Sequence, residues 1–177
     1  EEIGQKAFEN CKSLITEISL PESVRVIGSS AFSSSAIKGN LTFPHNLESI
    51  GSSAFSGCSS LTGSLVIPDK VEVIPSSAFW HCGFTGTLTL PKGLFEIGSS
   101  AFSGTKFKGE LNLPSSIATI GSQAFESTLF NGTLVLPSEL ISLGSSVFSG
   151  CWRLSGVVEI PENIVAIPSQ LFSGCTG

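Results

Sequence analysis

Of all side chains in this sequence, the five cysteine thiols could take part in the most kinds of chemistry, because a thiol can act as a nucleophile, bind a metal ion or form a disulfide. They are Cys11, Cys58, Cys82, Cys151 and Cys175. Structural zinc sites usually pair their cysteines as Cys-x-x-Cys, and no such pair occurs here. We therefore expect no metal site.

Each cysteine lies three residues after a phenylalanine. The same position is filled elsewhere by a small polar residue: Ser35, Thr105 or Thr128. This exchange is typical of a small, tightly packed interior site and favours free, buried thiols. Disulfides between Cys58 and Cys82, or between Cys151 and Cys175, are the alternative, since stacked copies of a repeat could bring these pairs close enough. The odd count would leave Cys11 unpaired.

The two histidines, His45 and His81, could serve as general bases. His45 follows a proline, and His81 directly precedes Cys82 in a turn. Sequence neighbours do not have the geometry of a nucleophile and its base, and the two histidines occupy different repeat positions. No Ser-His-Asp or Cys-His arrangement can therefore be assembled. We expect both histidines to be solvated surface side chains.

The carboxylates are scattered along the chain. Glu17, Glu110 and Glu159 lie in copies that are not adjacent, whereas the acid and base of a glycoside hydrolase stand about 5–9.5 Å apart. Glu48 and Glu72 lie in adjacent copies, but no third reactive group converges on them. The sequence thus predicts no catalytic residue and no cofactor-binding residue, and the chain is not expected to be an enzyme.

Two short motifs could suggest ligand binding or modification. Gly-Ser-Ser stretches resemble phosphate-binding loops, but each precedes an apolar pair ending in phenylalanine and recurs along the chain, which indicates a structural turn. Asn40-Leu41-Thr42 and Asn131-Gly132-Thr133 match the N-glycosylation sequon, although about one or two chance matches are expected at this Ser and Thr content. The sequons matter only in a eukaryotic source.

These residues share positions because the chain is a repeat. Proline follows an apolar residue at intervals of 23 or 24 residues, and a phenylalanine lies 11 residues after each of these prolines. The length changes between the Cys position and the next large apolar residue, as in Cys82-Gly83-Phe84 against Cys58-Ser59-Ser60-Leu61, so this point is a bend. The prolines are Pro21, Pro44, Pro68, Pro91, Pro114, Pro137 and Pro161, and Phe8 belongs to a truncated first copy.

The residue pattern of each copy predicts one short strand and one irregular segment. Apolar residues alternate in segments such as Leu65-Val66-Ile67, as on a β-strand, and the following proline ends the strand. Such strands at equal spacing would pair in parallel. The second half, as in residues 71–79, predicts a 3₁₀-like turn or short extended segment on the opposite side. The Gly, Ser and Pro content excludes a long α-helix.

One copy cannot bury its own apolar side, so the copies must stack. The sequence therefore predicts a single solenoid over residues 1–177, with about eight coils, of which the first and last are truncated, and with a continuous internal column of phenylalanines. Because the chain begins and ends within a copy, we expect a fragment of a longer protein, with any targeting signal outside it.

Composition limits the function further. Hydrophobic residues make up 41% of the chain, which is enough to form a core, and charged residues make up only 13%. The net charge of −5 argues against nucleic acid as a partner. No apolar run approaches the about 18 residues of a membrane span, so we expect no membrane insertion of this segment.

The segment 88–104, Leu-Thr-Leu-Pro-Lys-Gly-Leu-Phe-Glu-Ile-Gly-Ser-Ser-Ala-Phe-Ser-Gly, resembles the BspA-like (Treponema pallidum type) leucine-rich repeat. The family pattern is apolar-x-apolar-Pro, then Val/Leu-x-x-Ile-Gly-x-x-Ala-Phe, then Cys. The resemblance covers essentially the whole chain, although Val147 and Leu171 replace the alanine. It implies a right-handed leucine-rich repeat solenoid with a parallel β-sheet on the concave side and short 3₁₀ or extended segments opposite. It also implies a secreted or cell-surface protein of host-associated bacteria or some protists, often an adhesin.

The residue between the two apolar residues of each predicted strand should point outward. These residues form a candidate concave binding strip: Ser19, Thr42, Val66, Thr89, Asn112, Val135 and Glu159. The strip is nearly uncharged and lacks the Trp, Tyr or Arg clusters of tight interfaces, which favours weak or multivalent contacts. We expect a non-enzymatic protein-binding or adhesive segment whose protein or glycan ligand lies on a host or neighbouring cell. The alternative is a structural spacer or a self-assembling solenoid, since open ends allow end-to-end self-association.

Overall fold

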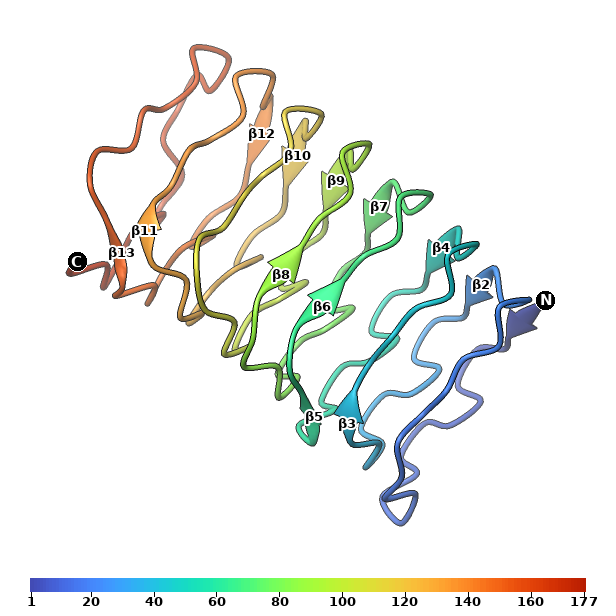
Figure 1. The fold of residues 1–177 in the computed structure, drawn as a ribbon. Helices are drawn as coiled ribbons and strands as arrows, with labels where there is room; N and C mark the ends of the chain where they lie inside the picture. The colour runs from blue at the N-terminus through green and yellow to red at the C-terminus, as the bar shows by residue number, and fades with distance from the viewer.

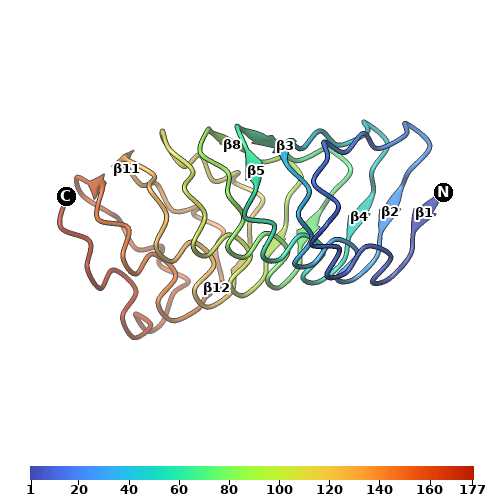
Figure 2. The same cartoon turned by 90° about the horizontal axis from the view of Figure 1, so that it is seen from below.

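The computed structural model describes residues 1–177. Its coils lie side by side along one axis, and the two termini lie at opposite ends of the stack (Figure 1). Figure 2 shows the same row of coils seen at 90° to the first view. All regular elements are two-residue strands, and every strand pair is parallel. The predicted class, a parallel-strand solenoid without long helices, is confirmed. The chain forms no helix with the length and apolar character needed to cross a membrane.

The most extensive pairing runs along the Val-x-x-Ile segments, in the second half of each copy. There β1 (Glu2–Ile3), β2 (Val26–Ile27) and β4 (Ser49–Ile50) form one sheet. A second sheet on this side contains β7 (Val73–Ile74), β9 (Glu96–Ile97), β10 (Thr119–Ile120) and β12 (Ser142–Leu143). The final apolar residue of each strand faces the core, and the residue before it faces outward. The segment expected to be a turn or short extended piece therefore holds most of the strand pairing.

Pairing is sparse along the apolar-x-apolar-Pro segments. Only β6 (Leu65–Val66) and β8 (Leu88–Thr89) pair there, with Leu65 N–H donating to the Thr87 carbonyl at 2.9 Å. Two further pairs lie at the preceding bend: β3 (Gly39–Asn40) with β5 (Leu61–Thr62), and β11 (Gly132–Thr133) with β13 (Leu154–Ser155). The predicted parallel pairing of these segments is thus seen at one junction, between β6 and β8.

The stretch from proline to phenylalanine has the same length in every copy, and its segments stack in constant register. Along the apolar-x-apolar-Pro segments, the proline has no N–H group to donate. Repeat length does not separate paired from unpaired coils there. Four intervals have 23 residues, and only the one from Pro68 to Pro91 holds a strand pair.

A single core runs the length of the stack. It contains 41 buried residues, and its centre is the predicted phenylalanine column. The rings from Phe8 to Phe172 stack with centroids 5.0–5.7 Å apart and planes within 9° of parallel. A second column, Phe84, Phe107 and Phe130, packs edge-on against the first. The column prediction is confirmed.

The Gly-Ser-Ser stretches form the turn that leads into this column. The residue before each apolar-Phe pair has a left-handed backbone with φ of 55–60°: Ser30, Ser53, Ser77, Ser100, Gln123, Ser146 and Gln170. This conformation is unfavourable for residues other than glycine. It turns the N–H along the stack axis, and in every copy but the last this N–H donates to the next coil, as from Ser30 to the Ser52 carbonyl at 2.9 Å. The stretches therefore act as structural turns, as expected.

Candidate binding surface

All seven residues of the strip are exposed. The flanking apolar residues point the other way, so Leu65 and Ile67 are buried while Val66 is 60% exposed. At Val135, which is 71% exposed, the neighbours Leu134 and Leu136 are buried. The alternation thus sets the outward direction that the sequence predicted.

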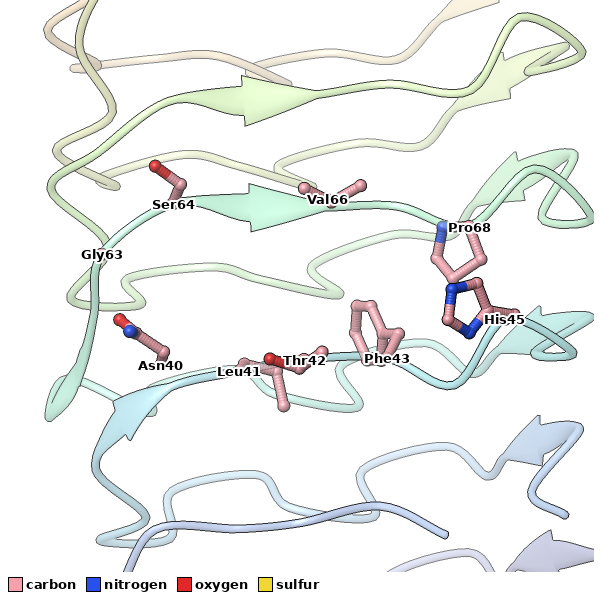
Figure 3. A pocket seen from close by; sticks show the side chains of 9 residues that line it. All are labelled: Asn40, Leu41, Thr42, Phe43, His45, Gly63, Ser64, Val66 and Pro68. Carbon is pink, nitrogen blue, oxygen red and sulfur yellow. The ribbon is translucent and has the colours of Figure 1, made fainter. Parts of the chain in front are cut away.

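A groove opens between the second and third coils of the strip (Figure 3). Its volume is about 600 Å³, and Thr42 and Val66 of the strip lie on its two sides. Figure 3 shows the Phe43 ring rising between the two segments, with His45 beside Pro68 at one end. Asn40 and Ser64 supply polar groups at the other end. We call this the N-terminal groove.

The N-terminal groove continues toward the first coil. A depression of about 400 Å³ shares Asn40, Thr42 and Phe43 with it and adds Ser19 of the strip. Glu17 and Glu22 line this part.

A second groove lies at the opposite end of the strip. It has a volume of about 640 Å³ and is lined by Glu159 of the strip, Glu162, Asn163 and Ser138 among others. A smaller depression beside it is lined by Val135 and Val157. We call this the C-terminal groove. No lysine or arginine lines either groove, so carboxylates are the only fully charged groups at the two ends of the strip.

The two larger grooves coincide with a difference in repeat length that the sequence shows. The N-terminal groove lies in the 24-residue interval from Pro44 to Pro68, and the C-terminal groove lies in the 24-residue interval from Pro137 to Pro161. The paired strands β6 and β8 lie in a 23-residue interval. The depression at Ser19 lies in the 23-residue interval from Pro21 to Pro44, so the longer interval accompanies the two larger grooves without accounting for every opening. Phe43, Asn40 and Ser64 are the lining residues that sequence reasoning missed.

The cysteines lie in the interior column that their shared position predicted. All five are free thiols, and Cys58, Cys82 and Cys151 are buried. Each of these three donates its S–H to a phenylalanine carbonyl of the preceding coil at 3.0–3.1 Å: Phe32, Phe55 and Phe125. Thr105 and Thr128 fill the same position but donate within their own coil, to the carbonyls of Phe102 and Phe125 three residues earlier. The position requires a small donor, which explains the exchange of Cys with Ser and Thr.

Burial makes these thiols poor nucleophiles. Removal from water raises the pKa of Cys58 and Cys151, although hydrogen bonds from Ser35 and Thr128 partly oppose the shift. Burial raises the pKa of Cys82 well above its ordinary value, and the neighbouring Cys58 adds to the shift. Reaction needs an accessible thiolate, and these sites provide neither access nor charge.

We expect iodoacetamide at neutral pH to modify at most Cys11 and Cys175 in the folded chain, because only these two thiols are partly exposed. All five should react after unfolding without reductant. Mass spectrometry of peptides from both samples measures this. Rapid native labelling of Cys82, or fewer than five free thiols after unfolding, would contradict the buried-thiol column.

The histidines lie apart from any reactive group. His45 is strongly exposed, and its Nδ1 lies 3.5 Å from a carboxylate oxygen of Glu22. His81 is exposed and packs edge-on against Trp80, with ring centroids 4.2 Å apart. The Cys82 thiol faces the core, so His81 and Cys82 do not form a pair.

The carboxylates considered for acid–base chemistry are all exposed. Glu48 forms a close ion pair with Arg25 of the preceding coil at 2.6 Å, and Glu72 has no ion-pair partner. No group of three or more His, Cys, Asp or Glu side chains converges anywhere in the chain. Glu17 and Glu159 contribute to the grooves instead.

Both sequon asparagines are exposed, but their surroundings differ. Asn40 lines the N-terminal groove. The Asn131 side-chain oxygen accepts a hydrogen bond from the Gly109 N–H at 3.0 Å. A glycan on Asn40 would occupy the groove, whereas one on Asn131 would lie outside both grooves. Use of either sequon stays a prediction.

The outer face of the sheet containing β9, β10 and β12 exposes apolar side chains. Phe95 is 52% exposed, and Ile141 and Val165 are also exposed. The strand register places Phe95, Ala118 and Ile141 on successive coils. This face lies on a different side of the coil from the strip and serves below as a comparison surface.

A family model described as BspA type leucine rich repeat region (6 copies) matches residues 1–130 and 62–177, which together cover the whole chain. Among solved structures, the chain is similar to a leucine rich cell surface protein from Faecalibacterium prausnitzii, with 33% identity and a TM-score of 0.74. That match covers 89% of this chain and 42% of the other, so the chain spans less than half of that protein.

Two further solved structures share the fold. The leucine rich repeat protein of Treponema pallidum is 27% identical with a TM-score of 0.50, over 87% of this chain and 71% of its own. A leucine-rich repeat protein from Eubacterium ventriosum is 19% identical with a TM-score of 0.52, over 98% of this chain and 61% of its own. No curated protein matches the chain. The family match spans the whole chain, and the repeat it describes is the coil seen in the structure: the chain belongs to the BspA type leucine rich repeat family.

Proposed function

We propose that this chain is a non-enzymatic, protein-binding segment of a secreted or cell-surface bacterial protein, and that it binds its partner along the strip. The proposal rests on one observation: seven exposed side chains are held in a row by a continuous core, with a groove at each end. The description of the Faecalibacterium relative as a cell surface protein supports the location.

The chemistry of the strip indicates the kind of partner. Both ends carry carboxylates, Glu17 and Glu22 at one end and Glu159 and Glu162 at the other, without a lining cation. The middle offers hydroxyl, amide and small apolar groups. A protein surface with polar and basic side chains complements this arrangement. Because the strip has no aromatic anchor, each contact should be weak, and display of many copies should raise the avidity.

We expect beads coated with the chain to bind proteins on an array of human extracellular proteins, and to do so less at high salt because exposed charges are screened. Thr42→Arg and Val66→Arg should reduce the binding by about tenfold or more, since they place a cation in the N-terminal groove. The matched control is Ser142→Arg, an exposed strand position on the opposite sheet.

The array distinguishes three outcomes. Loss with the groove variants alone supports the strip. Loss with Phe95→Asp while the groove variants bind normally would move the site to the apolar sheet face. Absence of any salt-sensitive partner on the array would contradict the proposal and favour a structural spacer.

A further inference from the structure

The bend that follows each phenylalanine of the column differs in charge from the rest of the chain. We call the first seven residues after each of these phenylalanines, with residues 173–177 after the last one, the bend edge: 9–15, 33–39, 56–62, 80–86, 103–109, 126–132, 149–155 and 173–177. Of the nine Lys and Arg residues and fourteen Asp and Glu residues, the bend edge holds five and two, a balance of +3. The remaining four and twelve give −8.

This local balance decides which ligands the bend edge attracts. At an ionic strength of about 0.15 M, exposed charges act over only about 8 Å. A ligand on the bend edge therefore meets an excess of cations, although the net charge of the chain is −5.

The cations of the bend edge are free, whereas its carboxylates are engaged. Glu9 forms an ion pair with Lys6 at 3.4 Å, and Glu126 accepts hydrogen bonds from Gln123 and Ser103. All five cations are exposed and none forms an ion pair: Lys12, Lys38, Lys106, Lys108 and Arg153. The bend edge thus presents positive charge that the chain itself does not compensate.

Both tryptophans of the chain also lie on the bend edge. Trp80 is 42% exposed, and Trp152 is 50% exposed. The guanidinium carbon of Arg153 lies 4.8 Å from the centre of the Trp152 ring. An exposed indole offers a flat apolar face, and a guanidinium that stacks on a ring keeps N–H groups free to bind an anion. The strip has neither kind of side chain.

The bend edge is continuous between the two tryptophans. Lys106 N–H donates to the Phe84 carbonyl of the preceding coil at 3.0 Å. Asn131 N–H bridges the next junction, and β11 pairs with β13 at the one after it. Figure 1 shows β3, β5, β11 and β13 along one side of the stack. Gly177 of the following coil lies beside the Trp152 carbonyl, so this stretch lies inside the stack.

The spacing of the coils fits a linear sugar chain that runs along the stack axis. The column rings beneath this stretch, from Phe79 to Phe148, are 5.4–5.7 Å apart. One pyranose ring with its glycosidic oxygen has about the same length. An extended polypeptide advances about 6.6 Å for every two residues and so does not keep step with the coils. A sugar chain can place one unit on each coil, with C–H faces of its rings on the two indoles.

The cations indicate where this chain carries its acidic groups. Lys106 and Lys108 lie on one coil, and Arg153 lies on the second coil after it, with Asn131 on the coil between them. Carboxylates on every second sugar would therefore meet the cations in turn. Lysine and arginine form charge-assisted hydrogen bonds with carboxylates, and arginine can do so through two parallel N–H groups.

We propose that the bend edge binds a linear acidic polysaccharide that carries a carboxylate on alternate sugar units. The polysaccharide lies along the stack axis across the stretch from Trp80 to Arg153. This site is separate from the strip, and the proposal does not depend on binding by the strip.

The test is a fluorescence titration of the 177-residue chain with a hyaluronan decasaccharide, in which glucuronate alternates with N-acetylglucosamine. The chain has two tryptophans and no tyrosine, so its emission reports on the bend edge. We expect a saturable change in tryptophan emission and weaker binding at higher salt. Lys106→Gln combined with Lys108→Gln should weaken the affinity about tenfold, because two charge contacts are lost.

Two further variants separate the site from general charge effects. Trp80→Ser should weaken the affinity about fivefold and keep the fold, because serine fills the equivalent position at Ser56 and Ser103. Lys70→Gln combined with Lys92→Gln is the matched control, since both lysines are exposed and lie outside the bend edge. The control should bind like the parent. Circular dichroism spectra show whether each variant keeps the parent fold.

Polyglutamate and neutral dextran of similar length are the comparison ligands, and neither should bind as hyaluronan does. Equal affinity for polyglutamate would show a surface that recognises charge alone, as on an acidic protein segment, and would overturn the proposal. An unchanged emission with hyaluronan would also overturn it. The same would follow if the Lys70 and Lys92 control lost as much affinity as the Lys106 and Lys108 variant.

Discussion

Replacing Phe102 with alanine is expected to lower the free energy of unfolding by about 3–5 kcal/mol, through lost transfer free energy and the cavity left behind. Phe102 is fully buried. Its ring stacks on Phe79 at 5.4 Å and on Phe125 at 5.5 Å, and it packs edge-on against Phe107 at 6.2 Å. Backbone hydrogen bonds on both sides of the ring, from Phe79 N–H to the Ala101 carbonyl and from Phe102 N–H to the Ala124 carbonyl at 2.9 Å, fix the spacing between coils, so the neighbouring rings cannot close the cavity.

Urea denaturation of parent and variant measures this loss. The matched control is Phe95→Ala, because Phe95 is a phenylalanine of the same coil but is 52% exposed. Its truncation should cost less than about 1 kcal/mol. A loss for Phe102→Ala as small as that of the control would show that the column does not stabilise the stack. A lower m-value in the variant would show that the two halves of the solenoid unfold separately.

The column and the strip were predictable from sequence because each depends on one local period. A phenylalanine at constant distance from proline must return to the same place in every coil, as Phe32 and Phe55 do. Alternation around Val66 likewise sets which side chains face outward without reference to any other coil. The position shared by Cys, Ser and Thr indicated a small interior site for the same reason, while its role as a hydrogen-bond donor appears only in the structure.

The strand pairing and the grooves depend on two coils at once, and the sequence does not show them directly. Whether neighbouring coils stay apart at Thr42 and Val66 depends on how both coils pack, with the Phe43 ring between them. The length of the repeat does not decide it, because the depression at Ser19 lies in a 23-residue interval.

The left-handed turns were also beyond local reasoning. Ser30 and Gln123 adopt φ values of 55° and 60°, which single-residue preference disfavours. Their N–H groups gain hydrogen bonds to the next coil at 2.9 Å, so the backbone cost is offset by tertiary contacts. Preference within one copy cannot reveal a conformation that neighbouring copies stabilise.

Stability is expected to fall steeply as the pH rises above about 9, because three buried thiols keep their protons in the folded chain. Burial raises the pKa of Cys58, Cys82 and Cys151 above the ordinary value of 9.0. Below pH 9 the folded and unfolded chains are both protonated at these sites, so the thiols add no pH dependence. Above pH 9 the unfolded chain releases the protons while the folded chain retains them. Each thiol then removes about 1.4 kcal/mol of stability per pH unit, or about 4 kcal/mol for the three together, until the pH passes the raised pKa values.

Urea unfolding in reductant at pH 7.5, 9 and 10 measures this slope, and few other groups should contribute to it. The chain has no tyrosine, and all seven lysines are exposed, so folding removes no lysine from water. The control replaces Cys58, Cys82 and Cys151 by threonine, which fits because Thr105 and Thr128 fill the same position natively and donate to Phe102 and Phe125 at 2.7 and 2.9 Å. The variant should lose much less stability than the parent from pH 7.5 to 10, because Cys175 is the one remaining thiol whose pKa is raised by burial. If the stability of the parent changed as little with pH as that of the variant, the thiols would be hydrated in the folded chain. The whole stack depends on an interior column without water.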